Sequence, residues 1–122
     1  MKKLIINNRD ELVILTLDHI AAVVAEGNCV NLLYLTGMKQ RTLTIGISKF
    51  YDMIRGAYNS SPSCPFVKLG RSVIINQLFL YDINILRQVI ILSDDTQNIQ
   101  IAVPKQLLRQ YRDMILKTQQ QQ

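Results

Sequence analysis

The stretch FVKLGRSVIIN, residues 66–76, most constrains the fold of this chain of 122 residues. An apolar segment, residues 66–69, stops at Gly70, and a second apolar segment occupies residues 73–75. Glycine permits a sharp bend between them, because a residue without Cβ can take a positive φ or let another backbone approach closely. The pattern therefore predicts two short strands joined by a turn that carries Arg71, whose five fixed donors suit an anionic polymer.

The same stretch resembles the signature of a known family. It is similar to F-x-[KR]-[IL]-x-[RK]-S-x-[IL]-[IV]-N, the central motif of the LytTR-type DNA-binding domain of bacterial transcription regulators. The matching residues are Phe66, Lys68, Leu69, Arg71, Ser72, Ile74, Ile75 and Asn76. Family members usually carry His at the position of Gly70 and an aromatic residue at that of Val73. Residues 13–30 and the segment from residue 99 onward are also similar to the opening and the ending of the family's domain.

The resemblance implies that the turn between the two strands enters the major groove of DNA. The family uses the residue at Arg71 to contact its target, and the arginine fork matches guanine O6 and N7 as well as phosphate oxygens. Lys68 is expected to contact the DNA backbone, and Gly70 and Ser72 flank Arg71 in the turn. Because family members carry His in place of Gly70, we expect that the bend does not demand glycine and that a contact has been lost.

Two further positions are implied to face the DNA. The turn at Asn28 lies on the DNA side in the family, so its amide is expected to donate to a base edge or a phosphate. After the last strand the family usually has Ser followed by Arg or Lys. This chain has Pro104 and Lys105 there, which keeps the cation and loses the hydroxyl.

Each of these residues also has a purely structural interpretation. Asn28 is equally well explained as a turn residue, and Lys105 as a surface lysine in the first turn of a helix. Arg71 has the alternatives of a solvated side chain or of an ion pair with Asp82. The resemblance favours the DNA-binding role for Arg71, and the sequence leaves the other two open.

Positive charge is concentrated in two parts of the chain. The net charge is +5 at pH 7; residues 19–81 hold six bases and two acids, and residues 104–122 have a balance of +3. Residues 82–103 have a balance of −2. One surface is therefore expected to be basic, which weakly favours a polyanion partner.

The hydrophobic pattern predicts many short strands and two helices. The expected strands are residues 4–6, 12–17, 20–25, 29–35, 41–45, 66–69, 73–75, 78–85, 88–92 and 98–103, with turns between them that include one at residues 36–39. Apolar residues recur at spacings of three and four in two places, which predicts helices near 48–58, with Ser48 as a candidate cap, and near 104–117.

These elements predict a mostly β fold with two peripheral helices. The hairpin order of the strands gives a compact β-rich domain, and the resemblance narrows it to small antiparallel sheets stacked in an elongated LytTR-like body. We expect a single domain over residues 1–117, followed by a disordered polar tail at 118–122.

Enzyme, metal and cofactor chemistry find little support in the sequence. His19, the only histidine, stands at a strand start and is better explained as a turn residue, and the pair Asp94-Asp95 is typical of a turn. Cys29 and Cys64 have no metal-ligand spacing and are expected to be free thiols of a reducing cytoplasm. We expect no enzyme, no cofactor, no membrane span and no signal peptide.

The sequence therefore favours a free-standing LytTR-type domain of the bacterial cytoplasm, without the receiver or sensor that family members usually carry in front. It would bind double-stranded DNA sequence-specifically and regulate transcription, alone, as a homodimer or as two copies on repeated sites. One alternative is a protein-interaction module that has lost its DNA contacts and binds a partner regulator. A second is an RNA-binding β-barrel, which the scarcity of aromatic residues for base stacking disfavours.

Overall fold

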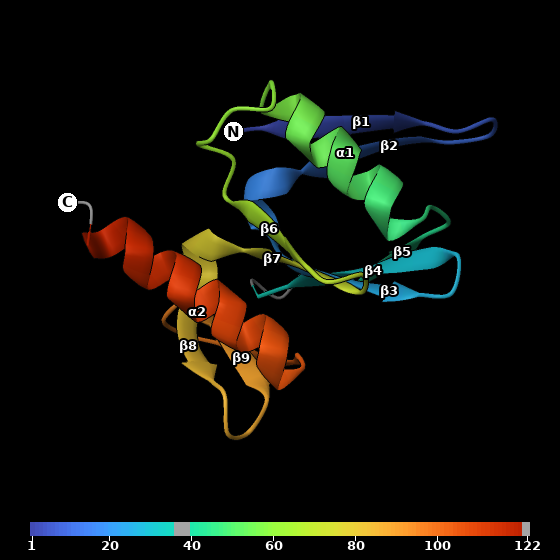
Figure 1. Ribbon diagram of the computed structural model, residues 1–122. Helices are drawn as coiled ribbons and strands as arrows, with labels where there is room; N and C mark the ends of the chain where they lie inside the picture. The colour runs from blue at the N-terminus through green and yellow to red at the C-terminus, as the bar shows by residue number, and fades with distance from the viewer. Residues whose placement is uncertain (36–39, 121–122) are drawn as a thin grey trace. The chain divides into compact units, whose positions relative to one another are not determined.

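A computed structural model describes residues 1–35 and 40–120 (Figure 1). The chain divides into two compact units, Met1–Leu78 and Phe79–Gln122, and each is described by itself. The turn expected at residues 36–39 lies outside the described residues. The expectation of a single domain over residues 1–117 stays a prediction.

The first unit contains two antiparallel sheets and one α-helix. The strands β1 and β2 form a hairpin, and five strands form a sheet in the order β5-β4-β3-β7-β6. The elements are β1 (Lys3–Asn7), β2 (Leu12–Thr16), β3 (Ile20–Glu26), β4 (Cys29–Tyr34), β5 (Arg41–Leu43), α1 (Ile47–Ala57), β6 (Phe66–Leu69) and β7 (Val73–Asn76). Short 3-10 turns occupy Leu17–His19, before β3, and Gln77–Phe79, after β7.

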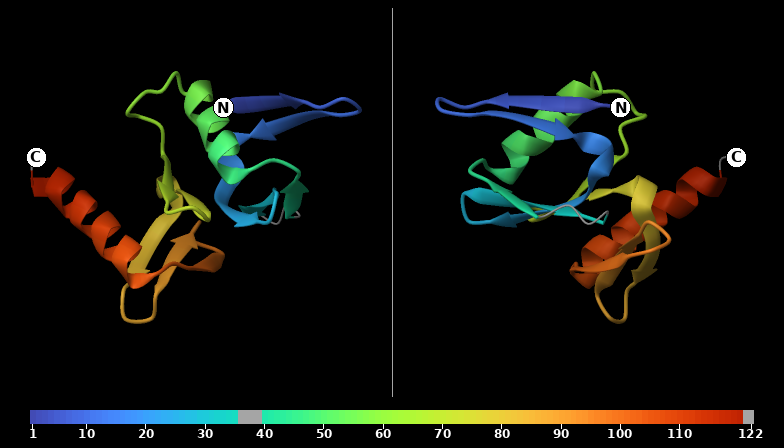
Figure 2. Two further views of the ribbon diagram at one scale, coloured as in Figure 1. Left: turned by 45° about the vertical axis from the view of Figure 1, so that its right-hand side comes forward. Right: turned by 180° about the vertical axis from the view of Figure 1, so that it is seen from behind.

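The core of the first unit lies where the hairpin, the five-stranded sheet and α1 meet. Figure 2 shows α1 beside the β1–β2 hairpin in both views. Strand alternation sends every second side chain inward, and the apolar stripe of α1 covers the same core. Its buried members include Leu4, Val13, Leu15, Val23, Val30, Leu32, Phe50, Ile54, Phe66 and Ile74.

The second unit is a three-stranded antiparallel sheet with one helix. The sheet has the order β10-β9-β8, built from β8 (Leu80–Asn84), β9 (Val89–Ser93) and β10 (Asn98–Ala102), and α2 (Lys105–Gln120) follows. Pro104 precedes the helix, where its missing N–H costs nothing. The buried side chains of this unit are Ile90, Leu92, Ile101, Val103, Leu108 and Tyr111.

The structure confirms the mostly β fold with two helices and corrects three local expectations. Ser48 is not the cap of α1, because the helix begins at Ile47 and Gly46 holds the cap position. The strand expected from residue 78 begins at Leu80, after the 3-10 turn. The expected polar tail begins inside α2, since the helix continues to Gln120; glutamine is a good helix former.

Candidate nucleic-acid interface

The topology of the five-stranded sheet brings two turns to one end. β3 pairs antiparallel with both β4 and β7, so the end of β3 at Glu26 and the start of β7 at Val73 lie side by side. The backbone N–H of Ala25 donates to the carbonyl of Ser72 at 2.8 Å, which ties the second turn to β3. We call residues 26–28 and 70–72 together the turn end of the sheet (Figure 1).

Arg71 lies in the middle of the β6–β7 turn. Leu69 pairs with Val73, so the turn consists of three residues, and all three are exposed. Within residues 1–35 and 40–120, the Arg71 side chain makes no hydrogen bond and no ion pair. Asp82, the alternative partner from sequence, lies on β8 in the second unit. The guanidinium is thus presented to solvent on a turn whose backbone is fixed at both ends.

Gly70 has a backbone reason to be glycine. Its φ is +65°, in the left-handed region that side chains disfavour. This φ favours glycine, and the expectation that the bend does not demand glycine stays a prediction. The histidine of the family is still compatible with this φ, because His is among the residues enriched at positive φ.

Lys68 lies near the same end but on the face of the sheet that α1 covers. It pairs with Ile74, a core residue, and its half-buried side chain crosses to the first turn of α1. There its Nζ donates to the Ser48 Oγ at 3.0 Å. Its ammonium forms no ion pair in the described ranges, and two donors remain available.

Asn28 is exposed in the β3–β4 turn, directly after Gly27, which has φ +59°. Its amide makes no hydrogen bond in the part of the chain that the structure describes, and this leaves it available to a partner. The neighbouring Glu26 is engaged instead: its carboxylate accepts from Asn31 Nδ2 at 2.6 Å, and Asn31 Oδ1 accepts from Thr42 Oγ1 at 2.7 Å. This cross-strand network, which the sequence did not predict, fixes the one acid of the turn end.

Of the other two predicted site residues, Ser72 joins the turn end and Lys105 belongs to the second unit. Ser72 is exposed, and its contribution to the fold is the backbone carbonyl bound to Ala25. Lys105 is the first residue of α2 and is also exposed. The first unit therefore brings together Asn28, Gly70, Arg71 and Ser72, with Lys68 on the adjoining face.

Asn76, a residue of the signature, has a structural role that sequence reasoning missed. It is fully buried, its Nδ2 donates to the carbonyl of Ile20 at 3.0 Å, and its Oδ1 accepts from the N–H of Leu78 at 3.0 Å. The available signal in the sequence was a polar residue directly after the apolar residues 73–75, which indicates a buried polar side chain. It holds β7 to the start of β3, at the end opposite to the turns.

The other polar residues considered from sequence serve the fold. His19 lies in the 3-10 turn before β3, and the neighbouring Asp18 accepts from the backbone N–H of Lys2 at 3.1 Å. Asp94 accepts from the backbone N–H groups of Gln97 and Thr96, which lower the pKa of its carboxyl. In residues 1–35 and 40–120, no three His, Cys, Asp or Glu side chains gather as metal ligands would. Neither α-helix of that part of the chain is both long and apolar enough to span a bilayer.

Comparison with known proteins gives a structural match only. No protein-family model and no curated protein matches the sequence. Among solved structures, the chain is similar to the LytTr DNA-binding domain of a Bacillus cereus protein described as a methyl-accepting/DNA response regulator. The two are 14% identical, the match covers 94% of this chain and 97% of that one, and the TM-score is 0.61.

The chain has the LytTr fold. The match extends over both units, so the likeness is not limited to one hairpin. It confirms the fold expected from the signature at residues 66–76. On this LytTr fold, the β6–β7 turn carries an exposed arginine whose side chain makes no hydrogen bond or ion pair within residues 1–35 and 40–120.

Proposed function

We propose that this chain binds double-stranded DNA sequence-specifically and regulates transcription in the bacterial cytoplasm. The observation that carries the proposal is the exposed Gly70-Arg71-Ser72 turn of a LytTr fold, with the Arg71 guanidinium directed to solvent. The Bacillus cereus domain with this fold is described as a DNA-binding domain. The backbone of the turn is tied to β3 by the Ala25–Ser72 hydrogen bond, so docking mainly has to order the Arg71 side chain.

In this proposal the β6–β7 turn, at the end of the five-stranded sheet, enters the major groove, where each base pair presents a distinct pattern of donors and acceptors. In this proposal Arg71 donates two hydrogen bonds to guanine O6 and N7, the commonest specific contact. Asn28, on the neighbouring turn, donates to a base edge or phosphate. Lys68 and Lys105 bind phosphate oxygens and position the domain without reading sequence.

The charge distribution supports the same partner. The basic segment 19–81 lies almost wholly in the first unit, and Glu26, the acid nearest to Arg71 in the pairing of the strands, is bound to Asn31. This hydrogen bond holds the Glu26 carboxylate on Asn31, and no ion pair between Glu26 and Arg71 forms within the described residues. Two copies on repeated sites are the expected arrangement on DNA, since a single turn reads only a few base pairs.

Selection of bound duplexes from a random pool, followed by a salt titration on the selected site, tests the proposal. Neutralising about four to six phosphates should give a slope of log affinity against log salt of roughly −4 to −5. Recovery of one sequence motif together with that slope is the expected result. A flat salt response, or no duplex binding at low salt, would contradict DNA binding.

A protein-interaction module is the second candidate, favoured by one feature of the β1–β2 hairpin. Ile5, Leu12 and Ile14 are 59%, 57% and 53% exposed, and Ile5 pairs with Ile14 on the outer face of the hairpin. Exposed apolar side chains that cluster in this way mark interaction sites. The occupant would be a partner regulator or a second copy of the chain. Sedimentation equilibrium of the wild type and of Ile14→Lys, together with the duplex assay, separates the two candidates.

A further inference from the structure

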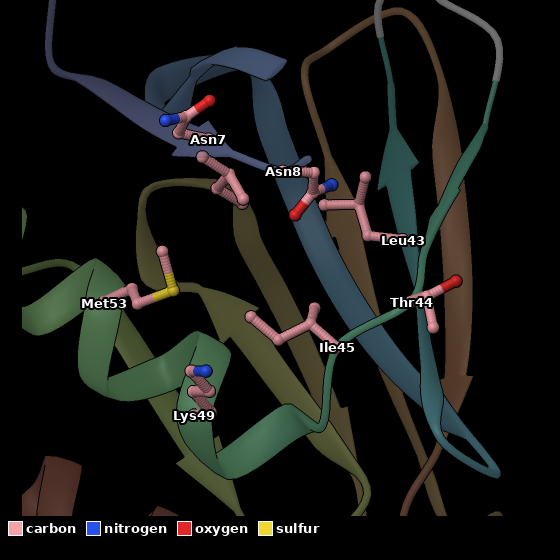
Figure 3. A pocket seen from close by; sticks show the side chains of 8 residues that line it. Asn7, Asn8, Leu43, Thr44, Ile45, Lys49 and Met53 are labelled. Atoms are coloured by element: carbon pink, nitrogen blue, oxygen red, sulfur yellow. The ribbon is translucent and has the colours of Figure 1, made fainter. Parts of the chain in front are cut away.

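The first unit contains a cavity of about 210 Å³ between the hairpin, the end of β5 and α1 (Figure 3). Four apolar side chains form one part of its wall: Ile6, Leu43, Ile45 and Met53. Leu43 is buried and the other three are half-buried, so they are held in place by the core behind them. This gives the cavity a fixed apolar floor.

The remaining wall is polar, and Lys49 is the one charged residue among its described lining residues. Asn7 and Asn8 come from the end of β1 and its turn, Thr44 from the segment after β5, and Lys49 from the first turn of α1. The Lys49 ammonium forms no ion pair with any residue of 1–35 or 40–120. An apolar floor beside one unpaired cation and two amide donors matches an amphiphilic anion.

The volume limits the size of that anion. An apolar cavity of about 150 Å³ holds one benzene molecule. A cavity of 210 Å³ therefore has room for a ring or short chain of that size with one small polar group attached. We propose that this cavity binds a small monocarboxylate, with its apolar body on Ile6, Ile45 and Met53 and its carboxylate at Lys49 Nζ.

The cavity adjoins the part of the first unit that holds Lys68. Lys49 follows Ser48, and the Ser48 hydroxyl accepts the hydrogen bond from Lys68. Residues 44–46 connect β5, next to the β3–β4 turn in the sheet, with the start of α1. A carboxylate bound at Lys49 would neutralise one cation of the first unit and so lower the affinity for DNA. This consequence rests on the proposed function, whereas the binding of the acid does not.

Titration of the full chain with benzoate, followed by NMR chemical shifts without DNA, tests the site. We expect saturable binding with a dissociation constant of about 1 mM, which is reasonable for a ligand of this size. Benzamide, which has the same shape without the charge, and acetate, which lacks the apolar body, should each bind at least about fivefold more weakly.

Two variants and one matched control decide whether the cavity is the site. Lys49→Gln, at an exposed position, should weaken benzoate binding at least about fivefold, and Met53→Trp should abolish it by filling the space. Lys3→Gln removes an exposed lysine of the same unit outside the cavity and should leave binding unchanged. Benzoate binding that neither variant weakens, equal binding of benzamide, or no saturation at about 10 mM would overturn the proposal.

A separate arm with duplex DNA tests the regulatory consequence. Saturating benzoate should weaken duplex binding by the wild type about twofold to fivefold and should have no effect on Lys49→Gln. Unchanged duplex affinity with bound benzoate would refute the coupling. Failure to bind duplex at all would count against the proposed function alone, because the NMR titration contains no DNA.

Discussion

The β6–β7 turn and the β9–β10 turn each join two antiparallel strands, but their polar side chains have different roles. In the β9–β10 turn, residues 94–97, one oxygen of Asp94 accepts from the Thr96 N–H, the Thr96 hydroxyl and the Gln97 N–H at 2.7–2.9 Å. The Ser93 hydroxyl accepts from the Asp95 N–H at 3.1 Å. In the turn at 70–72, no side chain makes a hydrogen bond within the described ranges.

The difference teaches how to separate structural turns from binding turns. A turn that satisfies its own polar groups is explained by the fold, since Asp and Ser stabilise turns through such bonds. A turn whose exposed cationic side chain makes no hydrogen bond or ion pair is available to a partner. The same contrast exists inside the signature, between the buried Asn76 and the exposed Arg71.

The largest expected effect on stability is that of Asn76→Ala. The substitution leaves the buried carbonyl of Ile20 and the N–H of Leu78 without their partner, which should lower the free energy of unfolding by about 2–3 kcal/mol. Urea unfolding monitored by circular dichroism measures it. Asn98→Ala, at an exposed asparagine of β10, is the control and should change stability by less than about 0.5 kcal/mol. A loss below about 1 kcal/mol for Asn76→Ala would contradict the role assigned to its amide.

Arg71→Ala should weaken DNA binding and leave the stability of the fold almost unchanged, the opposite of Asn76→Ala. If Arg71 reads a base, affinity for the selected site falls by about 1–3 kcal/mol while affinity for random duplex and the melting temperature change little. Fluorescence anisotropy on both duplexes measures it. Arg87→Ala, an exposed arginine near the β8–β9 connection, is the matched control. Equal weakening on both duplexes, with a salt slope smaller by about one unit, would show that Arg71 contacts a phosphate and not a base. Lys68→Ala is expected to weaken binding to both duplexes equally.

Local pattern was enough to predict the elements of the fold. Strand alternation and the change to helical spacing placed α1 and α2 within a few residues of their observed bounds, because apolar periodicity directly reports which face is buried. The residues of the β6–β7 turn were also found from sequence, since a glycine bend between two apolar runs is a local signal. The LytTr fold itself followed from the signature rather than from periodicity.

Contacts between distant segments were not predictable. The pairing of β3 with β7 joins residues about fifty positions apart, and the Asn76–Ile20 bond depends on it. To predict the hydrogen bond from Lys68 to Ser48, one would have to know that α1 begins beside β6. Without that contact, the sequence indicated Ser48 as a helix cap, which is wrong. The conformation of Gly70 also depends on its partner strands, because the tie from Ala25 to Ser72 fixes the turn.

Gly70→His tests whether the conformation of the turn or a lost contact explains the glycine. A side chain at φ +65° should lower the free energy of unfolding by about 1 kcal/mol, as should Gly27→Ala at φ +59°. Gly56→Ala is the matched control: it lies in α1 with open space around it and should raise stability by about 0.5–1 kcal/mol. An unchanged melting temperature for Gly70→His would show that the turn tolerates a side chain. Tighter duplex binding by the same variant would identify a restored contact.

The smallest expected effect is that of Asp94→Ala, and it should depend on pH. The hydrogen bonds from Gln97 and Thr96 favour the ionised carboxylate and lower the pKa of Asp94 in the folded protein below its ordinary value. A carboxyl whose pKa is lowered by folding adds stability at pH values above that ordinary value, and the contribution disappears as the pH falls through the folded value. The wild type should therefore be more stable than Asp94→Ala at pH 7, and the difference between the two melting temperatures should shrink as the pH falls below the ordinary pKa of an aspartate. Duplex affinity at pH 7 should be the same for both proteins, because the Asp94 carboxylate is engaged by hydrogen bonds within its own turn. A loss of DNA binding in Asp94→Ala without a loss of stability would contradict the contrast between the two turns.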